Sequence, residues 1–102
     1  MISHNGENYE LKYNLKRIEM IEGVTNMPTL ADIRRTGGML SVASLKTYIA
    51  YGIKKEGADA FLAPKKGMEV AEALIASNGY DSVCGLATEP WQRDCPFFFR
   101  AD

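Results

Sequence analysis

Few residues in this sequence could carry out acid–base chemistry. His4 is the single histidine, and it directly precedes an Asn-Gly turn signal. It lacks the oriented partner that a catalytic triad or a metal site requires. Glu69 and Glu72 are three residues apart, so on a helix they share one face, as a pair of catalytic carboxylates could. They lie opposite Met68 and Ala71, which indicates the solvated side of an amphipathic helix instead.

The potential nucleophiles are hydroxyl and thiol groups. Ser41, Ser44 and Thr47 recur at helical spacing, and we interpret them as a helix cap followed by a polar face. Cys84 and Cys95 match neither a CxxC motif nor a zinc-binding spacing. We therefore expect both to be reduced thiols that pack as small apolar groups.

Motifs for phosphate and zinc chemistry are absent: the sequence contains no GxxxxGK[ST], no GxGxxG and no HExxH. Lys65 and Lys66, followed by Gly67, stand near an expected helix start and could attract an anion. Cations at that end of a helix oppose its dipole, so we interpret them as a solvated face. We expect no catalytic residue, no cofactor and no metal ion, and hence no enzyme.

The composition is that of an ordinary soluble globular protein, with 46% hydrophobic and 25% charged residues. Twelve Lys and Arg against thirteen Asp and Glu give a formal net charge of −1, which disfavours a nucleic acid partner. The first residues contain no apolar segment of a signal peptide, and no stretch reaches the length of a membrane span. We expect one domain over residues 1–102, located in the cytoplasm and without a membrane partner.

The opening stretch ISHNGENYELKYN predicts a β-hairpin over residues 1–14. Asn5-Gly6 is a preferred pair for a two-residue type I′ turn, in which both residues have positive φ. Such a turn pairs His4 with Glu7 and Ile2 with Tyr9. Strand alternation then places three large side chains on one face, which needs a cover: Tyr9, Leu11 and Tyr13.

Capping signals predict the ends of the first two helices of the remainder, residues 15–102. Asn14 caps the first helix, and Gly23 is its expected stop. The second lies within residues 27–38, with Pro28 at its first position and Gly37-Gly38 at its end. Their inward stripes contain Leu15, Ile18, Ile21, Glu22, Leu30 and Ile33.

The clearest helix begins after Ser41 and is closed by Gly57, with Lys54 and Lys55 in its last turn. Its apolar positions repeat at i, i+3, i+4, i+7 and i+8: Leu45, Tyr48, Ile49, Gly52 and Ile53. A loop that buries Phe61 and Leu62 follows. A fourth helix over residues 65–79 then places Met68, Ala71, Leu74 and Ile75 inward.

The last segment contains two prolines. We expect a helix from Ser82 to Thr88, then a kink or a new turn starting at Pro90, because proline lacks an amide and disfavours helix at Glu89 before it. Pro96 should keep any helix from reaching the phenylalanines that follow. The fold class is therefore α+β, mostly helical: an N-terminal β-hairpin followed by four to five short helices.

Several apolar residues are candidates for contacts with a partner. Thioethers suit surfaces that adapt to a client, and an exposed apolar cluster usually marks an interface. For the methionines, packing in the core is the alternative; for the tryptophan and the three phenylalanines, it is a chain end folded back onto the core. The candidates are Met39, Tyr48, Tyr51, Met68, Trp91, Phe97, Phe98 and Phe99.

Residues 29–56 also allow a second interpretation. They contain a short helix, a Gly-containing turn and a second helix with Ser, Lys and Thr, an order typical of a helix-turn-helix. The alternative function is therefore a small DNA-binding phage or bacterial regulator. The turn is longer than usual, Tyr48 and Tyr51 interrupt the polar face, and the net charge is unfavourable.

The order of these features resembles a known family. An Asn-Gly turn before YELKYNLKRIEMIE, then GGMLSVASLKTYIAYGIKKEG and a further short helix, is similar to the small tail assembly chaperones of siphophages and related prophages of Gram-positive bacteria. The resemblance covers roughly residues 2–79. It rests on the pattern of elements, since no catalytic motif anchors it.

The resemblance implies a non-enzymatic protein that binds the tape measure protein of the phage tail and helps to recruit tail tube subunits. It also implies self-association and, in many members, a longer form produced by ribosomal frameshifting near the end of the short reading frame. Consecutive Phe codons can form an uninterrupted run of U, so Phe97 to Phe99 are a candidate slippery site.

Overall fold

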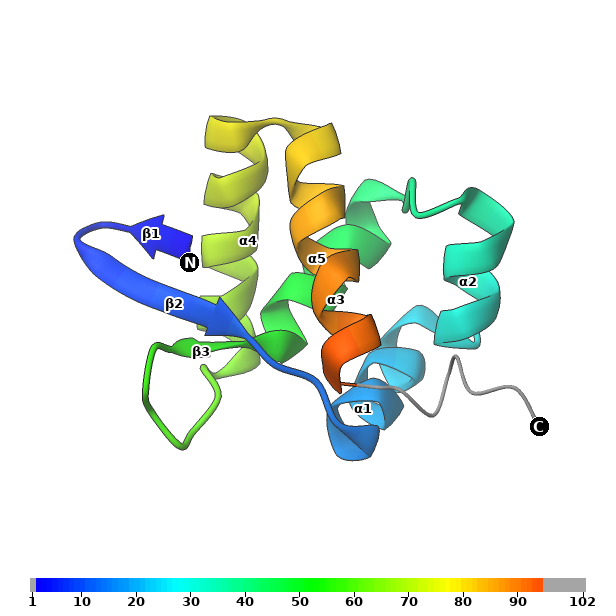
Figure 1. Ribbon diagram of the computed structural model, residues 1–102, viewed down its shortest axis with the longest axis horizontal. Helices are drawn as coiled ribbons and strands as arrows, with labels where there is room; N and C mark the ends of the chain where they lie inside the picture. The colour runs from blue at the N-terminus through cyan, green and yellow to red at the C-terminus, as the bar shows by residue number, and fades with distance from the viewer. Residues whose placement is uncertain (1, 95–102) are drawn as a thin grey trace.

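The computed structural model describes residues 2–94, which fold into three strands and five helices (Figure 1). This confirms the α+β class. The strands form one antiparallel sheet in the order β1-β2-β3. The elements are β1 (Ile2–His4), β2 (Glu7–Leu11), α1 (Leu15–Thr25), α2 (Thr29–Thr36), α3 (Val42–Gly52), β3 (Ile53–Lys55), α4 (Pro64–Asn78) and α5 (Tyr80–Asp94).

The N-terminal hairpin has the predicted register. Ile2 pairs with Tyr9 and His4 pairs with Glu7, and the turn residues Asn5 and Gly6 have φ values of 51° and 78°. Only glycine adopts the second of these without strain, which is why this dipeptide encodes the turn. The three side chains expected on one face, those of Tyr9, Leu11 and Tyr13, are all buried.

The third strand was not predicted. The helix expected to reach Gly57 ends at Gly52, and residues 53–55 pair with β2, Leu11 opposite Ile53 and Tyr9 opposite Lys55. The free edge of β2 provides backbone partners, and strand pairing buries Ile53 completely. These tertiary contacts outweigh the local helical periodicity, because the intrinsic preference of a segment for helix is small compared with the free energy of packing and strand pairing.

The first helix confirms its predicted start and corrects its predicted end. The side chain of Asn14 accepts a hydrogen bond from the amide of Arg17 at 2.9 Å. The helix continues past Gly23 to Thr25 and ends at Asn26, which adopts the left-handed conformation with φ 59°. Ile18 and Ile21 face the core, as expected, whereas Leu15 is 61% exposed.

The helix end predicted at Thr88 and the new turn predicted at Pro90 are wrong, because α5 is one helix from Tyr80 to Asp94 with Pro90 inside it. Contacts made by the residues that follow the proline compensate for the missing amide. Trp91 is fully buried, and the carboxylate of Asp94 accepts a hydrogen bond from the amide of Tyr13 at 3.0 Å. Arg93 donates to the carbonyl oxygen of Leu11 at 2.7 Å.

The core is built around α3, which contacts α1, α4 and α5. In Figure 1, α4 and α5 lie side by side and α2 lies at the end of the molecule away from the sheet. Helices α3 and α4 pack closely, since a Cβ atom on Gly67 would stand 2.5 Å from the carbonyl oxygen of Ala50. No helix within residues 2–94 has the length and apolar character needed to cross a membrane.

Candidate partner-binding surface

Two of the residues proposed to bind a partner belong to the core. Trp91 and Tyr48 are both 0% exposed, so neither can contact a partner in this folded state. Trp91 packs against Tyr13 with ring centroids 5.4 Å apart and against Tyr48 at 5.0 Å. Offset and edge-to-face contacts of this kind let one small core accommodate three large rings.

The other described candidates lie on three separate segments. Met39, in the connection between α2 and α3, is 52% exposed. Tyr51 and Met68 are half-buried, and Arg17 donates to the carbonyl oxygen of Tyr51 at 2.6 Å. The guanidinium group of Arg17 also lies 4.1 Å from the ring centre of Phe61, a cation–π contact. Phe97, Phe98 and Phe99 lie outside the described residues, as does Cys95.

A groove of about 210 Å³ lies between the sheet and α5. Its apolar walls come from both elements, and three charged residues line it as well. On α5 the lining residues are spaced i, i+3, i+4 and i+7, so they follow one side of the helix. The lining residues are Ile2, Tyr9, Glu10, Leu11, Leu86, Glu89, Pro90 and Arg93.

Two of the charged groups of the groove are held by neighbours. The amide of Gly57 and the ammonium group of Lys54 donate to Glu10 at 3.1 and 3.3 Å. These bonds lower the pKa of the Glu10 carboxyl, the amide contributing more. The hydrogen bond from Arg93 to Asp94 raises the pKa of the Arg93 guanidinium. Fixed charges beside apolar walls are typical of protein-binding surfaces.

The sequence did not reveal this groove. It joins residues 2–11 to residues 86–93, and nothing local indicates that these segments meet. Leu86 and Pro90 are four residues apart, which places them on one face only if the helix continues through the proline. The predicted break at Pro90 therefore concealed the signal.

The side chains examined for catalytic chemistry make structural contacts instead. Glu72 pairs with Lys46 at 2.6 Å and Glu69 with Lys66 at 3.9 Å, and both carboxylates are exposed. Ser41 accepts a hydrogen bond from the amide of Ser44 at 3.0 Å and is the cap of α3.

Thr47 donates to the carbonyl oxygen of Ala43 within the same helix, and Cys84 is buried, as predicted. Between residues 2 and 94, no group of three or more His, Cys, Asp or Glu side chains could hold a metal ion.

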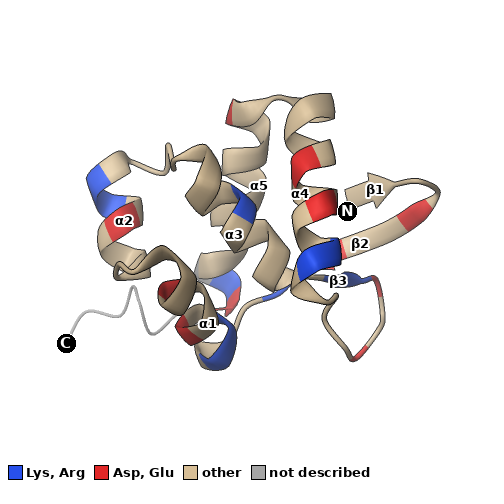
Figure 2. Cartoon of the chain, turned by 180° about the vertical axis from the view of Figure 1, so that it is seen from behind, with Lys and Arg blue, Asp and Glu red and all other residues tan. Residues whose placement is uncertain are grey.

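The helix-turn-helix interpretation requires side chains of α3 to enter a DNA groove. The structure places α3 at the centre of the fold, with Leu45, Ile49 and Ala50 fully buried. Its lysine, Lys46, is paired with Glu72. In Figure 2, acidic and basic positions are spread over several elements of the ribbon. This arrangement argues against α3 as a recognition helix.

Comparison of the chain with protein-family models, with curated proteins and with solved structures found no significant match.

Proposed function

We propose that the protein is a tail assembly chaperone of a siphophage or prophage. In this proposal it acts in the cytoplasm of the bacterial host, without catalysis or cofactor. It binds the tape measure protein noncovalently, helps to recruit tail tube subunits and associates with further copies of itself. A longer form made by frameshifting near Phe97 to Phe99 belongs to the same proposal.

The observation that supports client binding is the groove between the sheet and α5. Ile2 and Leu11 line it but are only 6% and 5% exposed, whereas half-buried Leu86 and the charged groups of Glu89 and Arg93 offer more of their surface. A long unassembled helical protein exposes apolar stripes flanked by charged residues. Single large apolar side chains from such a stripe match a groove of this size, and the neighbouring charges match its polar flanks.

Many copies acting on one client would strengthen a weak contact. A groove of about 210 Å³ accepts few side chains, so one copy alone should bind weakly. A tape measure protein is long and helical, and binding of many copies along one client raises the overall affinity. The proposal therefore requires an abundant protein and an elongated client.

The experiment is co-expression of the chain with the tape measure protein encoded beside its gene. The proposal predicts that the client stays soluble and co-purifies with the chain. Leu86→Glu, which places a charge on the apolar wall, should reduce the co-purified client about tenfold or more. The matched control is Leu15→Glu, because Leu15 is 61% exposed on α1 and does not line the groove.

Three results would contradict the proposal. One is an insoluble client in the presence of the chain, and another is an equal loss of client with both leucine variants. The third is DNA binding that weakens steeply with salt, since that would favour the regulator instead.

A further inference from the structure

Helix α2 contacts the rest of the protein in a different way from the other helices. Within α2, all of which the structure describes, the two buried residues are polar, Thr29 and Asp32. Ile33 packs against the edge of the apolar core and is half-buried. Buried polar groups contribute to stability only while their hydrogen bonds are made, so α2 depends on directional contacts.

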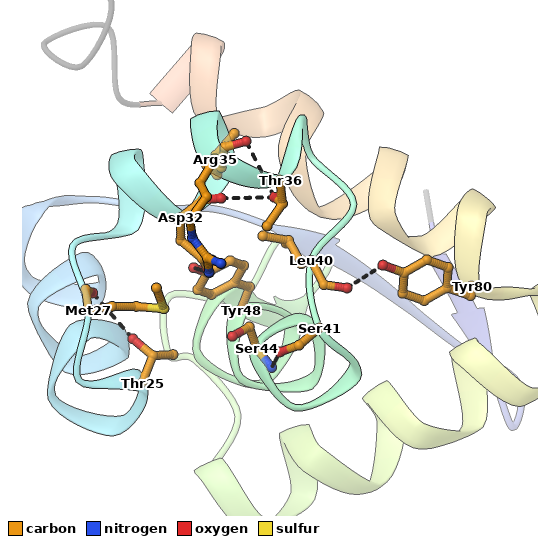
Figure 3. A network of polar contacts seen from close by, with 11 residues as sticks. Thr25, Met27, Asp32, Arg35, Thr36, Leu40, Ser41, Ser44, Tyr48 and Tyr80 are labelled. Atoms are coloured by element: carbon orange, nitrogen blue, oxygen red, sulfur yellow. Dashed lines mark hydrogen bonds and ion pairs between the residues drawn. The ribbon is translucent and has the colours of Figure 1, made fainter.

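Those contacts form a small cluster that we call the latch: Glu22, Thr29, Asp32 and Tyr48. The hydroxyl of Tyr48 on α3 donates to one carboxyl oxygen of Asp32 at 2.6 Å (Figure 3). The amide of Thr29 donates to Glu22 on α1 at 2.8 Å. The latch therefore joins α2 to α1 at its first residue and to α3 at its fourth.

The latch is almost dry. Asp32 is 2% exposed and Tyr48 is 0% exposed. Burial, followed by the hydrogen bond to Asp32, raises the pKa of Tyr48 well above its usual range, so the hydroxyl remains a donor at neutral pH. Arg35 reaches the other oxygen of Asp32 at 3.0 Å; its own side chain is 66% exposed, so water reaches the cationic partner of this ion pair but not the carboxylate.

Both ends of α2 have the geometry of a hinge. Asn26, before the helix, has φ 59°, and Gly37 and Gly38, after it, have φ 64° and 86°. A Cβ atom on either glycine would meet nothing within 4 Å, so no side chain packs closely against these two positions, and the nearest buried anchor after them is Leu40. Glycine pairs in open space readily absorb changes in φ and ψ.

Exposed apolar side chains flank the same helix. Val24 precedes α2 and is 50% exposed; Met39 and Val42 follow it and are 52% and 54% exposed. Separation of α2 would uncover the side of Tyr48 that now faces Asp32 and would remove Ile33 from the core edge. The apolar surface between Val24 and Val42 would therefore enlarge.

We infer that α2 is a flap, held closed by the latch, which opens as a unit while the core of α3, α4 and α5 stays folded. This inference does not depend on the proposed function. The opening belongs to the class of local unfolding events, in which a segment with few apolar contacts separates below the energy of global unfolding. It exposes an apolar surface that the closed protein lacks.

The test is hydrogen exchange of the folded protein, resolved by residue, in Tyr48→Phe and Tyr13→Phe. Tyr48→Phe keeps the ring and removes the donor to Asp32. Tyr13→Phe removes a buried hydroxyl that donates to the carbonyl oxygen of Tyr48 at 2.8 Å, a bond that does not involve α2. The amides from Asp32 to Gly38 should exchange roughly 5- to 30-fold faster in Tyr48→Phe.

In Tyr48→Phe, the exchange rates of the Ile49 and Leu74 amides should stay close to those of the unaltered protein. Tyr13→Phe should not accelerate exchange in α2 more than elsewhere. Glu22→Ala changes a half-buried residue and removes the carboxylate that accepts the hydrogen bond from the amide of Thr29. If Tyr48→Phe folds poorly, Glu22→Ala replaces it as the test and should also accelerate exchange of the α2 amides. Binding of the dye anilinonaphthalene sulfonate should rise with the opening of α2. Equal acceleration of α2 and α3, or of α2 in both tyrosine variants, would overturn the inference.

Discussion

Helices α2 and α3 follow one another in the chain, yet they are held by opposite kinds of contact. Helix α3 buries Leu45, Ile49 and Ala50 on the sides that face its neighbours. Helix α2 buries Thr29 and Asp32. Apolar contacts are non-directional and persist through small displacements, whereas a hydrogen bond weakens steeply once its geometry is lost. Helix α3 should therefore stay packed through small displacements, whereas α2 should separate once its hydrogen bonds are lost.

The aromatic core next to α3 should show the largest effect. Trp91→Ala removes the ring that packs against Tyr13 and Tyr48 and should destabilise the protein by about 3–5 kcal/mol. Urea unfolding followed by circular dichroism measures this loss, because Trp91 is the single tryptophan and fluorescence disappears with it. A loss below about 1 kcal/mol would contradict the packing of Trp91 in the core and weaken the contrast with α2.

The contact of α3 with α4 should give the next largest effect. Gly67→Ala places a Cβ atom 2.5 Å from the carbonyl oxygen of Ala50, and backbone cannot yield as a flexible side chain can. We expect a loss of about 1–3 kcal/mol in thermal or urea unfolding.

The matched control is Gly85→Ala, on α5. A Cβ atom there meets nothing within 4 Å, so its effect should be neutral or a gain of up to about 1 kcal/mol. The same result for both variants would show that α3 and α4 are not closely packed.

The hinge of α2 should give a smaller and more local effect. Gly37→Ala adds no steric contact but imposes a left-handed conformation with φ 64° on alanine, which costs about 1 kcal/mol. Hydrogen exchange should show the loss in residues 29–38 and not in α3. Uniform acceleration along the chain would mean that α2 and α3 unfold together.

The smallest effect lies outside both helices and concerns pH. The pKa of Glu10 is lowered in the folded protein, so its contribution to stability is present above about pH 4.5 and declines as the pH falls below it. Glu10→Gln should therefore make the urea midpoint less sensitive to pH between pH 6 and pH 3. Parallel curves for the two proteins would contradict the contacts of Glu10 with Lys54 and Gly57.

The parts of the fold that follow from neighbouring residues were predictable. The Asn5-Gly6 turn, the Asn14 and Ser41 caps and the glycines after α2 depend on contacts within a few residues. The strand β3 and the continuity of α5 depend on partners distant in sequence, β2 in one case and Tyr13 and Leu11 in the other. The helical periodicity that includes Ile53 and the helix-breaking tendency of Pro90 were overruled by those partners.

The candidate site was harder to predict for the same reason. Tyr48 and Trp91 were candidates for a partner surface, with Tyr48 also on the apolar repeat of its helix and core packing the alternative for Trp91. They contact each other across elements that are far apart in the chain. The latch was also missed. Asp32 stands in a polar segment, and nothing near it indicates that its carboxyl group meets a tyrosine hydroxyl from α3.

The most direct test of the contrast is hydrogen exchange of the unaltered protein at increasing urea concentrations, all below the unfolding transition. We predict that the amides from Asp32 to Gly38 exchange through an opening with a small dependence on urea, because the opening exposes only the surface under α2, far less than global unfolding does. The amides of Ile49 and Leu74 should show the full dependence of global unfolding. A single steep dependence shared by α2 and α3 would contradict the account.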